Sequence, residues 1–110
     1  MRIAFTFRNL ESSDAVKQYA TEKIAKFQKY LQAPLEADVV ASLERHLQCV
    51  DVTIVSGSSR YEAREESSDM YASIDLVIDK LDVQLKRNKG AQAAKKRNAG
   101  GIAQLNGKNK

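Results

Sequence analysis

Lysine and arginine are the residues of this sequence whose types and spacing could do chemistry, and that chemistry is the binding of phosphate groups. A first group is spaced by three residues within a segment expected to be helical, at Lys23, Lys26 and Lys29. A second group lies towards the end of a later helical segment, at Lys80, Lys86, Arg87 and Lys89. If the two helices lie side by side, these side chains form a continuous cationic surface whose affinity for phosphates falls steeply with salt. The alternative is that these lysines only solvate the helices.

The charge of the chain is unevenly distributed. The formal net charge is +4, yet all 14 acidic residues lie at or before Asp82. Residues 1–85 hold ten Lys and Arg and therefore carry −4, whereas residues 86–110 hold eight and no acid, +8. An acidic body with a basic end is typical of proteins that bind nucleic acid or an anionic surface, although a solubilising tail gives the same pattern.

Residues that could support catalysis or hold a metal are few. The chain has one histidine, His46, and one cysteine, Cys49. A zinc site usually needs four ligands, so this pair does not predict one. Asp75, Asp79 and Asp82 have the spacing of a solvated helix face, which explains them better than a cation site does. Phosphate-loop and nucleophile-elbow patterns are absent from the sequence. We therefore predict a protein that is not an enzyme and has no catalytic residue, metal or cofactor.

Aromatic residues give little support for binding single-stranded RNA. Tyr61 and Tyr71 stand alone among residues with a core-like pattern, so no platform for stacking bases is evident. Proteins that read single strands use such platforms. This favours recognition of structured RNA through its shape and backbone.

The elements that must position the cations follow from apolar spacing. Residues 2–7 alternate as a half-buried strand. Ser12 or Ser13 is expected to cap a helix that ends before Pro34, and its buried stripe is Val16, Ala20, Ile24, Phe27 and Leu31. Residues 37–43, 50–55 and 60–65 read as strands, with a polar break at 44–48 and a hairpin turn at 56–59.

A second helix closes the order. Ser67 or Ser68 is expected to cap it and Gly90 to end it. The buried stripe comprises Met70, Ile74, Val77, Ile78, Leu81 and Leu85. The carboxylates of Asp75, Asp79 and Asp82 then share one exposed flank, and Lys80 and Arg87 share the other.

The order β-α-β-β-β-α predicts an α+β fold, with a four-stranded sheet and both helices on one face. Two parts are expected: a domain over residues 1–90, and a basic, disordered tail over residues 91–110. No apolar run approaches the roughly 18 residues that span a membrane. With one cysteine an intrachain disulfide cannot form, which favours a reducing cytoplasm.

Two segments resemble a known family. Residues 69–81, DMYASIDLVIDKL, are similar to the signature helix of the ribosome hibernation promoting factor family, which includes the ribosome-associated inhibitor protein Y. Residues 21–31, TEKIAKFQKYL, are similar to its first helix. The resemblance covers about 90 residues and implies a fold like a double-stranded-RNA-binding domain. The opening residues Asp69, Met70 and Tyr71 are expected to be structural.

The resemblance also implies a partner and a function. Members bind ribosomal RNA between the head and body of the small subunit, block the positions of mRNA and tRNA, and silence translation in stationary phase or stress. A separate ribosome modulation factor is an expected partner on the same ribosome. A membrane, a small-molecule substrate and self-association off the ribosome are not expected. The RNA-contacting positions carried over by resemblance are Lys23, Lys26, Lys80, Lys86, Arg87 and Lys89.

Departures from the family pattern leave the branch open. Val83 stands where the family commonly has a basic residue, and the tail is basic where protein Y tends to be acidic. The C-terminal dimerisation domain of the long factors is not expected in 110 residues. The leading hypothesis is a short factor that promotes ribosome dimers. The alternatives are a protein Y-like inhibitor of single ribosomes and a general structured-RNA-binding module.

Overall fold

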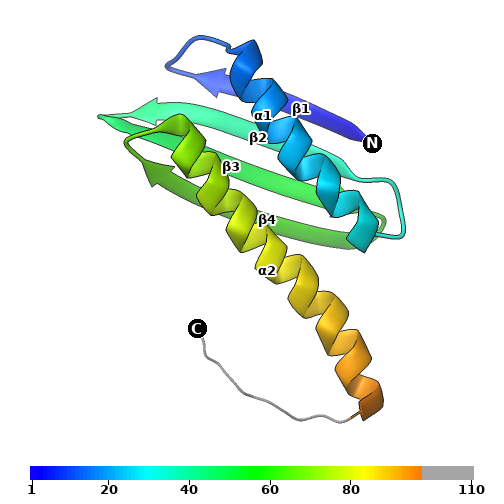
Figure 1. Cartoon of the computed structure of the whole chain (residues 1–110). Coiled ribbons are helices and arrows are strands. Elements are labelled where there is room, and N and C mark those ends of the chain that lie inside the picture. Colours follow the sequence, from blue (N-terminus) through cyan, green and yellow to red (C-terminus); the bar gives the residue numbers. More distant parts are fainter. Residues whose placement is uncertain (98–110) are drawn as a thin grey trace.

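A four-stranded mixed sheet carries both helices on one face (Figure 1). The computed structural model describes the backbone of residues 1–97 and the side chains of residues 1–87. Strand order is β1-β2-β3-β4, with β1 and β2 parallel and the other pairs antiparallel. The elements are β1 Arg2–Arg8, α1 Asp14–Ala25, the 3-10 helix η1 Lys26–Tyr30, β2 Glu36–Glu44, β3 Leu47–Ser56, β4 Ser59–Ser67 and α2 Met70–Arg97. The predicted α+β fold and element order are confirmed.

The core lies between the sheet and the helices. Because side chains alternate along a strand, one face of β2 and β3 presents Val39, Val52 and Ile54, which are buried. The predicted stripe of α1 is buried as far as Phe27, and Leu31 packs against it half-buried. The predicted stripe of α2 is likewise buried, except that Ile78 is half-buried.

The first helix begins as predicted but ends differently. Ser13 caps α1, because its hydroxyl accepts a hydrogen bond from the Val16 N–H at 3.2 Å. The chain then tightens into η1 instead of continuing as one α-helix to Pro34. The Gln28 side chain explains the return towards β2, since it donates to the Ala33 carbonyl and accepts from the Leu35 N–H.

Both hairpin connections are tight. Ser56 pairs with Ser59, and Gly57 adopts φ +59°, a left-handed conformation that glycine accepts without steric cost. The predicted polar break at 44–48 is shorter in the structure, because Glu44 already pairs with Leu47. Arg45 takes φ +61° in this two-residue turn.

The cap and the end of the second helix differ from the prediction. Asp69 is the N-cap, since its carboxylate accepts from the Ala72 N–H at 2.9 Å. The Ser67 hydroxyl instead bonds the fully buried Ser73, which also bonds the Gln48 carbonyl at 2.6 Å. The helix continues through Gly90 to Arg97, because the strong helix formers that follow outweigh the roughly 1 kcal/mol cost of one glycine.

The predicted boundary between domain and tail at residue 90 therefore falls within α2, whose end extends beyond the sheet (Figure 1). The predicted disorder of the tail falls largely on residues 98–110, which lie outside the described residues. Over the described part of the chain, no helix combines the length and apolarity needed to cross a membrane.

Candidate nucleic-acid interface

The two helices run in the same direction, and this decides where the cations gather (Figure 1). Tyr19 in α1 contacts Tyr71 and Asp75 near the start of α2, whereas Lys29 and Tyr30 share a groove with Asp82 farther along α2. The C-terminal ends of α1–η1 and of the packed part of α2 therefore lie at one end of the molecule. In the last turn of α1, Lys23 also complements the helix dipole.

The first group of predicted cations lies along this contact. Lys26 and Lys29 are exposed and Lys23 is half-buried, and all three line a groove of about 240 Å³ between the helices. The opposite wall of the groove is α2, which contributes Asp79 and Asp82. The groove is thus lined by both signs of charge.

Lys23 is held by a cluster between the helices. Its Nζ lies 3.9 Å from Asp75 Oδ1 and 5.0 Å from the centroid of the Tyr19 ring. The Tyr19 hydroxyl donates to Asp75 Oδ1 at 2.6 Å, and this hydrogen bond is the main cause of the raised pKa of Tyr19. Tyr19 and Tyr71 meet edge to face, with ring centroids 5.0 Å apart. The interpretation that Tyr71 stands alone was wrong, because helix packing could not be seen in the sequence.

The second group of predicted cations lies on two opposite sides of α2. Lys86 is on the side that faces α1, where its Nζ lies 3.1 Å from Asp82 Oδ2. The hydrogen bond with Asp82 is the main cause of the raised pKa of Lys86, and the nearby Tyr30 adds to it. Lys80 is on the other side and pairs with Glu65 of β4. Arg87, seven residues on, shares that flank.

Gln84 confirms which flank faces the sheet. Its side chain accepts from the Glu62 N–H at 3.4 Å and donates to the Glu62 carbonyl at 2.8 Å. These hydrogen bonds cover the outer edge of β4, which would otherwise present unpaired backbone groups. Lys80 and Arg87 therefore lie beside β4, away from α1.

The structure thus brings together only part of the predicted surface. Four of the cations lie around the groove between the helices: Lys23, Lys26, Lys29 and Lys86. The other two, Lys80 and Arg87, lie on the opposite side of α2, next to β4. The side chain of Lys89 lies outside the described residues. Sequence reasoning found both flanks of α2 but missed that the acidic one faces the lysines of α1. The spacing of acidic and basic residues along α2 indicated two flanks of opposite charge. Which flank faces α1 depends on how the two helices pack, and the sequence does not show this.

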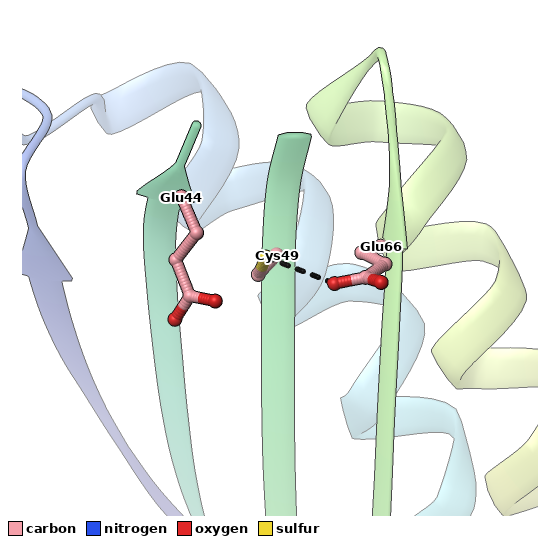
Figure 2. Close-up of side chains that lie close together, drawn as sticks. All are labelled: Glu44, Cys49 and Glu66. Atoms are coloured by element: carbon pink, nitrogen blue, oxygen red, sulfur yellow. Dashed lines mark hydrogen bonds between the residues drawn. The ribbon is translucent and has the colours of Figure 1, made fainter. Parts of the chain in front are cut away.

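The two residues considered for catalysis are separated. His46 is exposed in the β2–β3 turn, whereas Cys49 is buried on the sheet face away from the helices. The Cys49 thiol donates to Glu66 Oε1 at 3.5 Å, and Glu44 lies beside it (Figure 2). Burial, followed by the hydrogen bond to Glu66, raises the pKa of Cys49. A thiol with a raised pKa is a poor nucleophile at neutral pH.

Cys49 and the two carboxylates could offer three ligand atoms within 4.8 Å of one another, but the cluster is a poor cation site. Glu44 is already paired with Arg64 at 3.3 Å, and the thiol would have to lose its proton. A closed zinc site would need a fourth ligand.

Comparison with known proteins shows the family relationship of this chain, which the geometry of the site does not show. The sequence model of the sigma 54 modulation protein / S30EA ribosomal protein family matches residues 3–93. A ribosome hibernation promoting factor of Salmonella typhimurium is 35% identical over 89 residues, which is 81% of this chain and 94% of the relative. One from Azotobacter vinelandii is 32% identical over 92 residues, covering 84% of this chain and 86% of the relative.

Solved structures agree with the fold. The N-terminal domain of Thermus thermophilus Protein Y superimposes with a TM-score of 0.74 and 34% identity, covering 80% of this chain and 99% of that one. A ribosomal subunit interface protein from Coxiella burnetii gives a TM-score of 0.70 over 82% of this chain and 99% of that chain. At 24% identity, the second likeness supports the fold alone.

Proposed function

Because this chain belongs to the sigma 54 modulation protein / S30EA ribosomal protein family, we propose that it is a hibernation factor that binds small-subunit rRNA in the decoding channel. There it would exclude mRNA and tRNA and so inhibit translation. Family membership and the named relatives support the broader role in ribosome hibernation. The family is one of ribosome-associated proteins and not of enzymes, which agrees with the prediction from the sequence.

The observation that supports RNA binding most directly is the parallel arrangement of the helices. It gathers Lys26, Lys29 and Lys86 at one end of the molecule, where their positive charges can each neutralise a phosphate. Arg87 adds a cation on the other side of α2 from Lys86, whereas Lys80 lies farther back along β4, where it pairs with Glu65. In the pairs with Asp75, Asp82 and Glu65 the lysine side chains are 37–58% exposed, and pairs open to solvent are weak enough to be exchanged for phosphates.

The mechanism we propose is occlusion. A rigid α+β domain anchored through phosphates occupies the space that mRNA and tRNA need, and no bond is made or broken. The chain would act in the cytoplasm as a monomer off the ribosome, with a ribosome modulation factor as its partner on it.

Sedimentation of stationary-phase ribosomes separates the two branches of this role. We also propose that the chain promotes ribosome dimers, in which case deletion of the gene should remove them. A gain of dimers would instead mean an inhibitor of single ribosomes, which is the alternative.

A general structured-RNA-binding module is the remaining candidate. It is tested by co-sedimentation of the chain with small subunits in the presence of excess duplex RNA. Binding that resists the competitor supports a ribosomal site. Loss of binding in proportion to the competitor would support the general module.

A further inference from the structure

A hollow of about 390 Å³ lies at the cationic end of the molecule, between the end of η1, the β3–β4 turn and α2. Residues 29–33 form one wall and residues 56–59 form the opposite wall. Tyr61 of β4 and Leu85 of α2 complete it. Ligand sites run from roughly 300 to 1,000 Å³, so this hollow suits one small group.

The walls of the hollow are held in place by hydrogen bonds. The Ala33 carbonyl accepts from Ser56 Oγ at 2.8 Å and from Gln28 Nε2 at 3.0 Å. A Cβ atom on Gly57 would lie 3.4 Å from Ala33 Cβ, so the two walls approach to within one side-chain atom at this point. A site whose walls are already fixed loses little conformational entropy when a ligand enters.

The lining of the hollow suits an anionic group attached to a ring. No Asp or Glu is among the described residues that line it. By contrast, the inter-helix groove contains Asp79 and Asp82, and a third hollow, on the far face of the sheet, contains Glu36 and Asp38. The lining includes the rings of Tyr30 and Tyr61, the Lys29 ammonium, and polar groups of Gln32, Ser58 and Ser59.

Lys29 and Tyr30 connect this hollow to the candidate nucleic-acid interface. Both residues line the hollow and also the inter-helix groove. The Lys29 Nζ lies 5.3 Å from the centroid of the Tyr30 ring, which places a cation beside an aromatic face at the rim. A strand whose phosphates pass Lys26 and Lys29 therefore reaches the hollow directly.

We propose that this hollow receives one unpaired nucleotide of the bound RNA. Lys29 contacts its phosphate, the rings of Tyr30 and Tyr61 pack against its base or ribose, and the serine hydroxyls offer hydrogen bonds. Aromatic side chains beside a cation are the usual means of holding an unstacked base. The proposal rests on the proposed RNA-binding function and adds a site for a flipped-out nucleotide to a surface that otherwise reads only the backbone.

The test places a negative charge at the hollow and an identical one at the far end of the sheet. Ser58 is exposed, and its backbone is outside the left-handed region, so Ser58→Glu should fold normally. Ser68→Glu is the matched control, because Ser68 is also exposed and follows the opposite end of β4. Gln32→Glu, which keeps the side-chain size, is a second variant in case the turn is perturbed.

Binding of each variant to purified small ribosomal subunits is then measured, and the wild-type complex is cross-linked with ultraviolet light. We expect Ser58→Glu and Gln32→Glu to weaken binding about ten-fold, the scale of removing one stacked base, while Ser68→Glu changes it less than about two-fold. Peptides containing Tyr30 or Tyr61 should carry a cross-linked nucleotide.

The outcomes separate this inference from the proposed function. If the wild type binds small subunits but all three variants bind equally well, the nucleotide site is wrong and the ribosomal role stands. Cross-links from Tyr30 or Tyr61 to a ribosomal protein would also overturn the site. If the wild type does not bind small subunits, both proposals fail.

Discussion

At the scale of single residues, the lysines of the candidate nucleic-acid interface are not equivalent. Lys23 and Lys86 are paired with Asp75 and Asp82, whereas Lys26 and Lys29 are exposed at the rim of the groove. An exposed ion pair contributes at most about 1 kcal/mol, so pairing with Asp82 weakens the interaction of Lys86 with a phosphate without preventing it.

Charge reversal of Lys86 and Arg87 tests the interactions with phosphates. Lys86→Glu with Arg87→Glu should weaken binding to small subunits by about ten-fold or more, since two attractive interactions become repulsive. The slope of log affinity against log salt should become shallower by about two, one for each phosphate that is no longer neutralised. Filter binding or sedimentation between low and physiological salt measures both quantities.

The control for this variant carries the same change of charge on the opposite face of the sheet. Arg8→Glu with Arg60→Glu alters two exposed arginines that point away from the helices. This control should bind with nearly wild-type affinity. Equal salt slopes for both double variants would contradict the assignment of Lys86 and Arg87 to phosphates.

The pKa of the Tyr19 hydroxyl reports whether α1 and α2 are packed together. Its pKa is raised above 10.0, mainly because its hydroxyl donates to Asp75. The interaction therefore stabilises the fold below the unfolded pKa of about 10, and this contribution is lost as pH rises through the higher folded pKa. NMR of the tyrosine rings against pH should show Tyr19 titrating late. Asp75→Asn should lower its pKa towards 10, and an unchanged titration would contradict the hydrogen bond.

At the scale of elements, α2 contributes both to the core and to the candidate nucleic-acid interface. Its inner face buries Leu81 completely, whereas Leu76, five residues earlier on the same helix, is 43% exposed. Replacing each leucine by alanine therefore separates the contribution of core packing to stability from that of helix propensity.

Truncation of these leucines should differ strongly in effect. Leu81→Ala should lower the free energy of unfolding by roughly 2–5 kcal/mol, because burial is reduced and a cavity remains. Leu76→Ala should change it by less than about 0.5 kcal/mol. Urea unfolding followed by circular dichroism measures both. Similar decreases for the two variants would mean that the face of α2 is wrongly assigned.

The sequence was sufficient to predict those elements that depend on residues close together in the chain. Apolar spacing identified the strands and both helical stripes, and residue type narrowed the first cap to Ser12 or Ser13, of which Ser13 caps α1. It failed at the second cap: the Ser67 hydroxyl bonds Ser73 and the backbone of Asp69, and the Asp69 carboxylate caps the helix. The arrangement of the candidate RNA-binding residues was only partly predictable for the same reason. Spacing placed the lysines on helices, but only packing brings Lys23 to Asp75 and puts Tyr30 and Tyr61 in one hollow.

At the scale of the whole molecule, charge is polarised along the helices. Their starts carry Asp14 and Asp69, while Lys29 and Lys86 lie towards the other end, where the basic residues 86–110 begin. Parallel helices on one face of the sheet turn two separate sequence patterns into one cationic end.

Deletion of residues 91–110 should leave the folded domain intact, because Leu85 is the last buried side chain among the residues described. The thermal midpoint should change by no more than about 2 °C, on a scale where 1 kcal/mol is worth about 4–8 °C. Differential scanning calorimetry of the full and shortened chains makes this comparison. A large drop in the midpoint would show that the deleted segment packs against the domain.

The central claim is that the chain occupies the space of mRNA and tRNA on the small subunit. Its most direct test is co-sedimentation with empty small subunits and with subunits preloaded with mRNA and tRNA. We predict stoichiometric binding to the empty subunits and little binding to the loaded ones. Equal binding to both, or binding to neither, would contradict it.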